Sequence, residues 1–313
     1  MSSAWLFPGH GSQYVGMGRP LLRDTVQGRD WLALAENISG LPLGRLMERG
    51  PLLELTRPTV LEPLLACVSC AYVDWLVAAG MVPSALAGYS AGEVAAMYAA
   101  GIFDAQTCLR ISCLRGAALE QAALLQPGSM MSLSGLPLAD LLACLDNDAD
   151  VAVAAYNGPR HVTVSGTATG LSQATARARN AGAQTGRLDV AGPWHTELVA
   201  AACRRLHADL AECVFAEPKI PVWLGSTGAT CCDPVKLRAS LADSIVLPVQ
   251  WQTVVEGLVA GDIEAFLEVG PGHILCGLLG QMPLPRSIIT HFVERQGMVR
   301  LRLPLNFNIK KLG

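Results

Sequence analysis

The sequence predicts an α/β protein in which helices flank a parallel sheet and a smaller α/β module is inserted. Three observations lead to this fold class. The stretch Gly88-Tyr-Ser-Ala-Gly92 lies between an apolar run typical of a buried strand and a helix-forming run. Short apolar segments typical of buried strands recur towards both ends of the chain. Between them, residues 128–191 are ordered as strand, helix, strand, strand, helix, strand, which is the ferredoxin-like arrangement.

The composition indicates a folded protein with one large core and a smaller satellite domain. Hydrophobic residues make up 51% and charged residues 16% of the 313 residues. The net charge of −3 provides no basic surface, so we expect no nucleic-acid partner. No apolar run free of charge and proline reaches membrane-spanning length, so we expect no membrane partner. The ten cysteines show neither the spacing of a disulfide framework nor that of metal ligands, and we see no targeting segment before the first strand. We therefore expect reduced thiols in a cytoplasmic protein, with no metal and no cofactor.

The expected elements follow from apolar periodicity and from glycine and proline punctuation. We expect strands at 3–7, 84–87, 129–134, 151–156, 161–165, 184–190, 220–224 and 264–268, and helices at 63–79, 93–100, 105–125, 137–145, 167–181 and from 273 onward. The stretch Asn157-Gly-Pro-Arg160 is expected to form the turn between the middle strands of the inserted module. Beyond about Leu284 there is no clear motif, and the basic end (Arg300, Arg302, Lys310, Lys311) is expected to be a solvated tail.

Ser90 is the first candidate catalytic residue. Gly88 and Gly92 flank it at two residues on either side, where a strand and a helix pass too closely for a β-carbon, which is the geometry of a nucleophile elbow. Gly-x-Ser-x-Gly also occurs by chance in many chains. The predicted strand before it and helix after it favour the catalytic interpretation.

Two other segments are candidates to complete a site. The loop Pro8-Gly-His-Gly-Ser-Gln13 follows the first strand with its backbone N–H groups bare, so it is either an anion-binding loop or a plain turn. The chain leaves the inserted module through a rigid turn that places His195 at the junction of the two modules, where small-molecule sites often form. This position favours His195 among the six histidines without excluding the others.

Five motifs in order resemble those of malonyl-CoA:acyl carrier protein transacylases, which include stand-alone enzymes of fatty acid synthesis and acyltransferase domains of polyketide synthases. The motifs are Pro8-Gly-His-Gly-Ser-Gln13, Gly88-Tyr-Ser-Ala-Gly-Glu93, Leu114-Arg-Gly116, Gly192-Pro-Trp-His195 and Glu268-Val-Gly-Pro-Gly272. The resemblance covers roughly residues 3–280. It implies an α/β hydrolase-like large domain with a parallel sheet (residues 1–127 and 192–313) and an inserted ferredoxin-like subdomain (residues 128–191).

The resemblance also implies roles for individual residues. Ser90 corresponds to the nucleophile that takes the acyl group from CoA, and His195 to its general base. Arg115 corresponds to the residue that pairs with the substrate carboxylate, and the backbone N–H groups of His10 and Ala91 to the oxyanion hole. Arg110 lies five residues from Arg115 on the same predicted helix, so at most one of the two faces the site.

The function implied is transfer of a malonyl group from malonyl-CoA to the phosphopantetheine thiol of an acyl carrier protein, by a monomer. Three features depart from the family pattern: His10 replaces a usual Gln, Tyr89 replaces a usual His, and the segment after about Leu284 matches nothing. These departures leave the acyl-group preference open.

Two other functions compete with this interpretation. A serine hydrolase or thioesterase could use the same elbow, but it should carry an acid between the serine and the histidine to orient the imidazole, and Asp189 is a candidate by position. A non-catalytic carrier-binding module is disfavoured because Ser90, His195 and Arg115 are all present.

Overall fold

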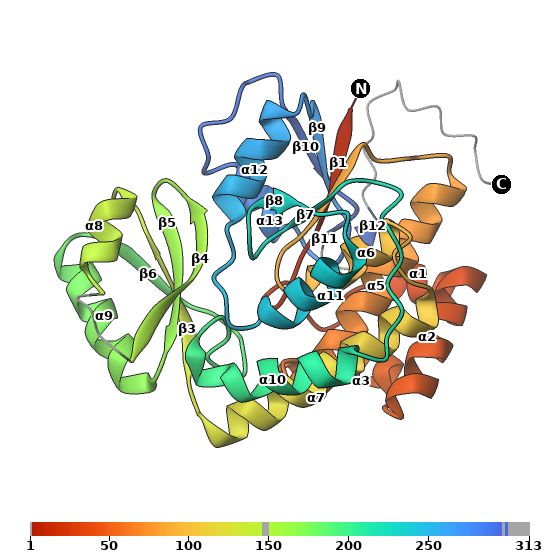
Figure 1. Cartoon of the computed structure of the whole chain (residues 1–313), viewed down its shortest axis with the longest axis horizontal. Helices are drawn as coiled ribbons and strands as arrows, with labels where there is room; N and C mark the ends of the chain where they lie inside the picture. The colour runs from red at the N-terminus through yellow and green to blue at the C-terminus, as the bar shows by residue number, and fades with distance from the viewer. Residues whose placement is uncertain (1, 146–149, 296–297, 300–313) are drawn as a thin grey trace.

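The computed structural model describes residues 2–145, 150–295 and 298–299, and it is a mixed α/β protein built on two sheets (Figure 1). The larger sheet has the strand order β10-β9-β1-β2-β7-β8. Its strands are β1 (Ser3–Phe7), β2 (Ala85–Gly88), β7 (Val222–Leu224), β8 (Ala229–Thr230), β9 (Ala265–Glu268) and β10 (Ile289–Phe292). The first five strands in the spatial order pair in parallel, and only β8 is antiparallel to its neighbour. The expected parallel sheet is therefore present, with β1 at its centre.

Successive side chains of β1 point to opposite faces of the sheet, so they are buried in two different cores. Trp5 and Phe7 belong to the main core, which includes most of the buried face of the long helix α5 (Pro58–Ala78). Ala4 and Leu6 belong to a second core formed with α12 (Trp251–Ala260) and α13 (Ile274–Leu279). Helices thus cover both faces of the sheet, which explains why β1, β2 and β9 are buried along their whole length.

Helix α5 is long and apolar enough to cross a membrane by length and composition, but 83% of its most hydrophobic window is buried inside the protein. It is a core helix that packs against α7 (Ala105–Leu125). The predicted start at Pro63 is wrong: the helix begins at Pro58, which already supplies the fixed φ angle of a first turn, and Pro63 lies inside it. Helix α7 has its predicted bounds, with Asp104 as the N-cap.

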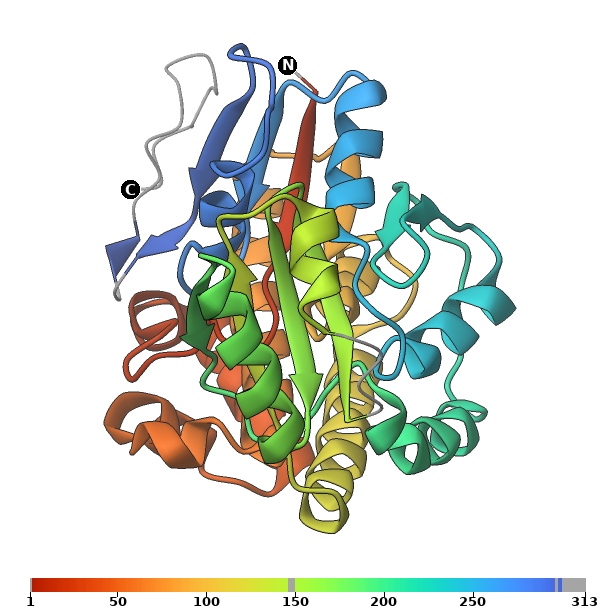
Figure 2. The same cartoon turned by 90° about the vertical axis from the view of Figure 1, so that its left-hand side faces the viewer.

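The smaller sheet is wholly antiparallel, with the order β4-β5-β3-β6. Its elements are β3 (Ser129–Ser134), α8 (Leu138–Ala143), β4 (Val151–Gly158), β5 (His161–Gly166), α9 (Ala168–Asn180) and β6 (Gln184–Arg187). Both helices lie on one face of this sheet (Figure 2), where Leu133, Val162 and Val164 form a separate core with Leu141 and Leu171. Backbone bonds of 2.8 Å between β4 and Val249 tie this sheet to the larger unit.

Several elements differ from the sequence prediction. Residues 19–55, for which no helices were predicted, form α1 (Arg19–Asp24), α2 (Val26–Ser39), α3 (Leu43–Arg49) and α4 (Leu52–Leu55). Strand β6 ends at Arg187 instead of 190, and Asn157 belongs to β4 instead of the turn. The other described elements are η1 (Glu197–Val199), α10 (Ala200–Leu210), α11 (Pro234–Asp243), β11 (Glu294–Arg295) and β12 (Met298–Val299).

Part of the segment after Leu284 packs against the rest of the protein and does not form a tail. Strand β10 adds the edge of the large sheet beside β9. Behind it the buried carboxylate of Glu294 accepts hydrogen bonds from the Gly18 N–H at 2.7 Å and from the Tyr72 hydroxyl at 2.8 Å. This anchor depends on contacts distant in sequence, so no local pattern could reveal it. The basic end at Arg300, Arg302, Lys310 and Lys311 lies outside the described residues.

The glycine at the start of α6 (Gly92–Ala99) gives a stability test. A β-carbon on Gly92 would lie 2.1 Å from the backbone oxygen of Phe7, so Gly92→Ala should lower the free energy of unfolding by about 1–3 kcal/mol or prevent folding. The matched control is Gly277→Ala in α13, where nothing lies within 4 Å of the added carbon. Because alanine favours a helix, the control should gain about 0.5–1 kcal/mol. Urea unfolding of both variants measures the difference, and equal effects would contradict the close packing.

Candidate active site

The serine elbow is built from three backbone segments that leave no room for β-carbons. Ser90 follows β2 and has a φ of 55°, a left-handed conformation that non-glycine residues rarely adopt. A β-carbon on Gly88 would lie 2.2 Å from the Glu93 nitrogen. One on Gly9 would lie 2.4 Å from the Tyr89 oxygen, so the loop after β1 runs directly against the elbow. This packing holds Ser90 at the end of its strand with the side chain turned to the pocket.

His195 lies beside the serine. Its Nε2 is 2.8 Å from Ser90 Oγ, and its Nδ1 is 2.9 Å from the carbonyl oxygen of Leu247. Since a carbonyl can only accept, Nδ1 carries the proton and Nε2 presents its lone pair to the serine hydroxyl. The imidazole is fixed further by its own backbone, with φ of 62° and an N–H that donates to Ile245 at 2.8 Å. The structure therefore holds a preformed serine–imidazole pair.

The environment of His195 keeps its imidazole neutral. Burial lowers the pKa of His195 to about 4, although the Leu247 carbonyl acts in the opposite direction and Arg115 adds to the decrease. Only 5% of this residue is exposed. A neutral imidazole is the form that accepts a proton, so the histidine is in its basic form over the physiological pH range.

No carboxylate orients this histidine in the part of the chain that the structure describes. Asp189, the acid that a hydrolase interpretation would use, lines the pocket at an exposed position, while the Nδ1 atom of His195 is taken by Leu247. The described part of the chain thus lacks the serine, acid and histidine set that a hydrolase of this kind requires.

Two backbone N–H groups lie next to the serine. Those of His10 and Ala91 have no acceptor among the described residues, whereas Gly92 and Glu93 bond back to the elbow. Ala91 is the N-cap of α6, so its N–H group has no acceptor within the helix. A β-carbon added to Gly9 would lie 3.3 Å from the Ala91 nitrogen, so the loop after β1 is adjacent to the start of α6.

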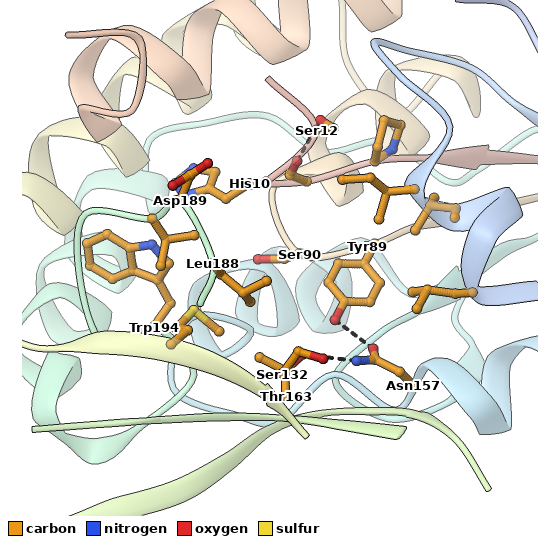
Figure 3. A pocket seen from close by; sticks show the side chains of 18 of the residues that line it. His10, Ser12, Tyr89, Ser90, Ser132, Asn157, Thr163, Leu188, Asp189 and Trp194 are labelled. Carbon is orange, nitrogen blue, oxygen red and sulfur yellow. Dashed lines mark hydrogen bonds between the residues drawn. The ribbon is translucent and has the colours of Figure 1, made fainter. Parts of the chain in front are cut away.

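These groups open onto a pocket of about 280 Å³ between the two sheets (Figure 3). Its walls are largely apolar, and the lining side chains include Met130, Leu188, Val190, Trp194, Ile274 and Leu278. At one end the Tyr89 hydroxyl donates to Asn157 Oδ1 at 2.8 Å, and Asn157 Nδ2 donates to Thr163 Oγ1 at 2.9 Å. Because Tyr89 belongs to the elbow and Asn157 to β4, these hydrogen bonds fix the small sheet against the segment that carries Ser90. Sequence reasoning placed Asn157 in a turn and so missed it.

Arg115 is buried, with 1% of the residue exposed, and does not line the pocket. Its Nε is 3.3 Å from Glu62 Oε2, and its Nη1 donates to the Leu241 carbonyl at 3.0 Å and to Ser244 Oγ at 3.3 Å. Arg110 is exposed and only 4.0 Å from the surface residue Glu212, so the expectation that one of the two arginines faces away is confirmed. Arg115 lies near the site, because its Nη1 donates to Ser244, and the next residue, Ile245, accepts from the His195 N–H.

Glu62 is a second charged residue that the sequence analysis missed. Its side chain is 1% exposed, and its Oε1 lies 3.1 Å from His10 Nε2. Burial raises the pKa of Glu62, but the attraction of Arg115 and the contact with His10 outweigh it, so the pKa lies below its ordinary value. The carboxylate of Glu62 is therefore ionised, and it lies between the side chains of His10 and Arg115. The only local signal was an acid near the start of the largely apolar helix α5.

One group of potential metal ligands is found in the described residues, at a distance from this chemistry. Cys203 and His207 on α10 face Asp243, and His207 Nε2 is 2.7 Å from Asp243 Oδ1. None of the three lines the pocket.

Comparisons with known proteins bear on this site. Residues 4–281 match the model of the acyl transferase domain family. The malonyl CoA-acyl carrier protein transacylase of Escherichia coli (strain K12) is 31% identical over 281 residues, covering 88% of this chain and 91% of the relative. The transacylase of the same name from Bacillus subtilis (strain 168) is 29% identical, covering 88% of this chain and 89% of the relative.

Solved structures agree with this relationship. A malonyl-transacylase in complex with a type II polyketide synthase acyl-carrier protein superposes with a TM-score of 0.88 at 27% identity, covering 94% of this chain and 96% of that one. An acyl carrier protein S-malonyltransferase from Vibrio cholerae superposes with a TM-score of 0.86 at 30% identity, covering 94% and 97%. With its serine elbow, its paired histidine and these relatives, the chain belongs to the acyl transferase domain family.

Proposed function

We propose that this protein transfers a malonyl group from malonyl-CoA to the phosphopantetheine thiol of an acyl carrier protein, through a malonyl ester on Ser90, in fatty acid or polyketide synthesis. The observation that carries the proposal is the 2.8 Å contact between Ser90 Oγ and His195 Nε2 in a chain of the acyl transferase family. Relatives named as malonyl transacylases span nearly all of the chain, and one was solved in complex with an acyl carrier protein.

In the first half of the reaction, Ser90 Oγ attacks the thioester carbonyl and His195 Nε2 takes the hydroxyl proton. The backbone N–H groups of His10 and Ala91 hydrogen-bond to the oxyanion of the tetrahedral intermediate, a contribution of about 3 kcal/mol per donor. The intermediate collapses with loss of the CoA thiolate, which receives the proton from His195. The products are malonyl-Ser90 and free CoA.

The second half repeats these steps with the carrier thiol as nucleophile. His195 takes the thiol proton, the thiolate attacks malonyl-Ser90, and the serine oxygen leaves and recovers the proton from His195. Since Leu247 holds the imidazole by a main-chain carbonyl, His195 can act as base and acid in turn without a partner carboxylate. The rival proposal of a hydrolase would need a carboxylate to orient this histidine, and His195 has none among the described residues.

Arg115 is proposed as the carboxylate-binding residue. Its recorded hydrogen bonds use Nε and Nη1, which leaves Nη2 to donate to a substrate carboxylate. A guanidinium suits a buried carboxylate better than an ammonium would, because it is more weakly hydrated.

We further propose that residues 1–127 and 192–313 form an α/β hydrolase-like domain and that residues 128–191 form a ferredoxin-like subdomain. The support is the parallel order of the large sheet and the antiparallel order β4-β5-β3-β6 with two helices on one face. We expect the protein to act as a monomer in the cytoplasm, on a soluble carrier.

Acylation of Ser90 tests the proposal directly. Malonyl-CoA alone should add one malonyl mass to the protein, and Ser90→Ala should abolish the adduct. His195→Ala should slow formation of the adduct by about two to four orders of magnitude because the general base is lost. Intact-mass spectrometry of quenched samples measures both effects. A labelled Ser90→Ala protein would refute the assignment of the nucleophile.

The acid limb of the pH profile tests the state of His195. Burial lowers its pKa to about 4, so the imidazole stays neutral as the pH falls below the ordinary value of 6.5 and becomes protonated only near 4. The rate of Ser90 acylation should therefore not fall between about pH 7 and about pH 5, whereas an unperturbed base would lose most of its activity. Rapid-quench acylation over this range gives the answer, and a half-maximal rate near pH 6.5 would contradict the buried geometry.

Selectivity between thioesters tests Arg115. Arg115→Ala should reduce kcat/KM for malonyl-CoA relative to acetyl-CoA by about two orders of magnitude, since a carboxylate buried without a partner costs about 3 kcal/mol. Arg115→Lys should recover only part of the loss. Arg110→Ala on the exposed face of the same helix is the control and should leave the ratio unchanged. If the ratio does not change in Arg115→Ala, another group binds the carboxylate.

A further inference from the structure

A cysteine, a histidine and an aspartate meet between two helices outside the pocket. Helices α10 and α11 pack against each other (Figure 1), with Cys203 and His207 on α10 and Asp243 at the end of α11. Cys203 and His207 are four residues apart, so the helix places them on one face. Their ligand atoms and a carboxylate oxygen of Asp243 all lie within 4.8 Å of one another.

Two donors converge on one oxygen of the aspartate. His207 Nε2 lies 2.7 Å and Cys203 Sγ 3.7 Å from Asp243 Oδ1. An ionised carboxylate can only accept, so the imidazole and the thiol both point a proton at the same atom. When a divalent cation binds there, the thiol proton passes to solvent and the imidazole carries its proton on Nδ1, which frees the Nε2 lone pair. The thiolate and the carboxylate then balance the two positive charges of the ion.

The distances fit a small tetrahedral ion. Metal bonds of about 2.3 Å to sulfur and about 2.0 Å to oxygen place these two ligand atoms about 3.5 Å apart. The structure has them 3.7 Å apart. A nitrogen and an oxygen ligand would be about 3.3 Å apart, so His207 has to move back slightly from Asp243. It is free to do so because 44% of its side chain is exposed.

The chemistry of the donor set favours zinc. Magnesium and calcium prefer oxygen ligands alone, whereas sulfur, nitrogen and oxygen together suit Zn²⁺. Three protein ligands leave a fourth position for water. Because His207 and Asp243 are both partly exposed, an ion can enter this position directly from solvent.

We propose that Cys203, His207 and Asp243 form a zinc-binding site that connects α10 to α11. The proposal does not depend on the transfer function described above. Cysteine spacing predicted no metal site, because Asp243 follows His207 by 36 residues and only the fold brings the two together.

The site lies at the start of the segment that holds the histidine of the serine–imidazole pair. The Asp243 backbone carbonyl accepts hydrogen bonds at 3.0 Å from the N–H groups of Val246 and Leu247. The Leu247 carbonyl is in turn the acceptor for His195 Nδ1. An ion on Asp243 would therefore connect this turn to α10. We expect bound zinc to stabilise the protein, since an ion that binds only the folded state favours that state by mass action.

Zinc binding to the reduced protein is the first test. Isothermal titration calorimetry with zinc chloride should give about one ion per chain. Cys203→Ser, His207→Ala and Asp243→Asn should each weaken the binding by about a hundredfold or more, since loss of a ligand costs at least as much as loss of a group behind it.

Two matched controls should keep the affinity of the parent protein. Cys232→Ser removes an exposed thiol that is not part of the site. Asp209→Asn removes an acid on the same helix α10, where it pairs with Arg205.

Cobalt reports whether the thiolate is a ligand. Co²⁺ bound to the parent protein should show the near-ultraviolet charge-transfer band of a sulfur–cobalt bond, and Cys203→Ser should lose this band while Cys232→Ser keeps it. Excess zinc should raise the Tm of the parent and of both controls and leave the Tm of Asp243→Asn unchanged.

The outcomes decide the proposal. If the parent binds no zinc, or if the three ligand variants bind it as tightly as the parent, the site is overturned and any bound ion is adventitious. Loss of binding in Cys232→Ser but not in Cys203→Ser assigns the ion to the exposed thiol and also overturns it. Circular dichroism checks that each variant is folded, and should one fail to fold, the other two decide. Labelling of Ser90 is measured separately, so failure of the transfer function leaves this result unaffected.

Discussion

The close approach of three backbone segments at the elbow is the constraint on which the rest of the site depends. Phe7 and Gly9 press against Gly92 and Tyr89 so tightly that a β-carbon would lie within 2.1 to 2.4 Å of backbone oxygen. The left-handed φ of Ser90 is tolerated because this packing over-determines it. The same packing brings the loop after β1 next to the start of α6.

Main-chain contacts from a distant part of the chain hold His195 beside Ser90. His195 is held by Ile245 and Leu247, which follow α11, and these contacts set both its position and its tautomer. The same turn contributes Ser244 to Arg115. One short segment therefore positions the imidazole and the guanidinium together.

Several buried polar and charged groups lie around the serine. A neutral imidazole, a paired arginine and an ionised glutamate share a site with an apolar pocket, and each state depends on the others. His10 and Tyr89, the two residues that depart from the family pattern, both make contacts in this site. His10 contacts Glu62, and Tyr89 anchors the small sheet through Asn157.

The sequence by itself determined the parallel sheet, the bounds of β1, β3 and α7, and the elbow, because apolar periodicity and glycine spacing are local signals. It could not determine that β10 and Glu294 complete the large unit, that Asn157 joins Tyr89, or that Glu62 neutralises Arg115. Each of these is a contact between residues far apart in the chain. Only the tertiary structure decides such contacts, because the energy of a buried charge depends on which neighbours replace the water it has lost.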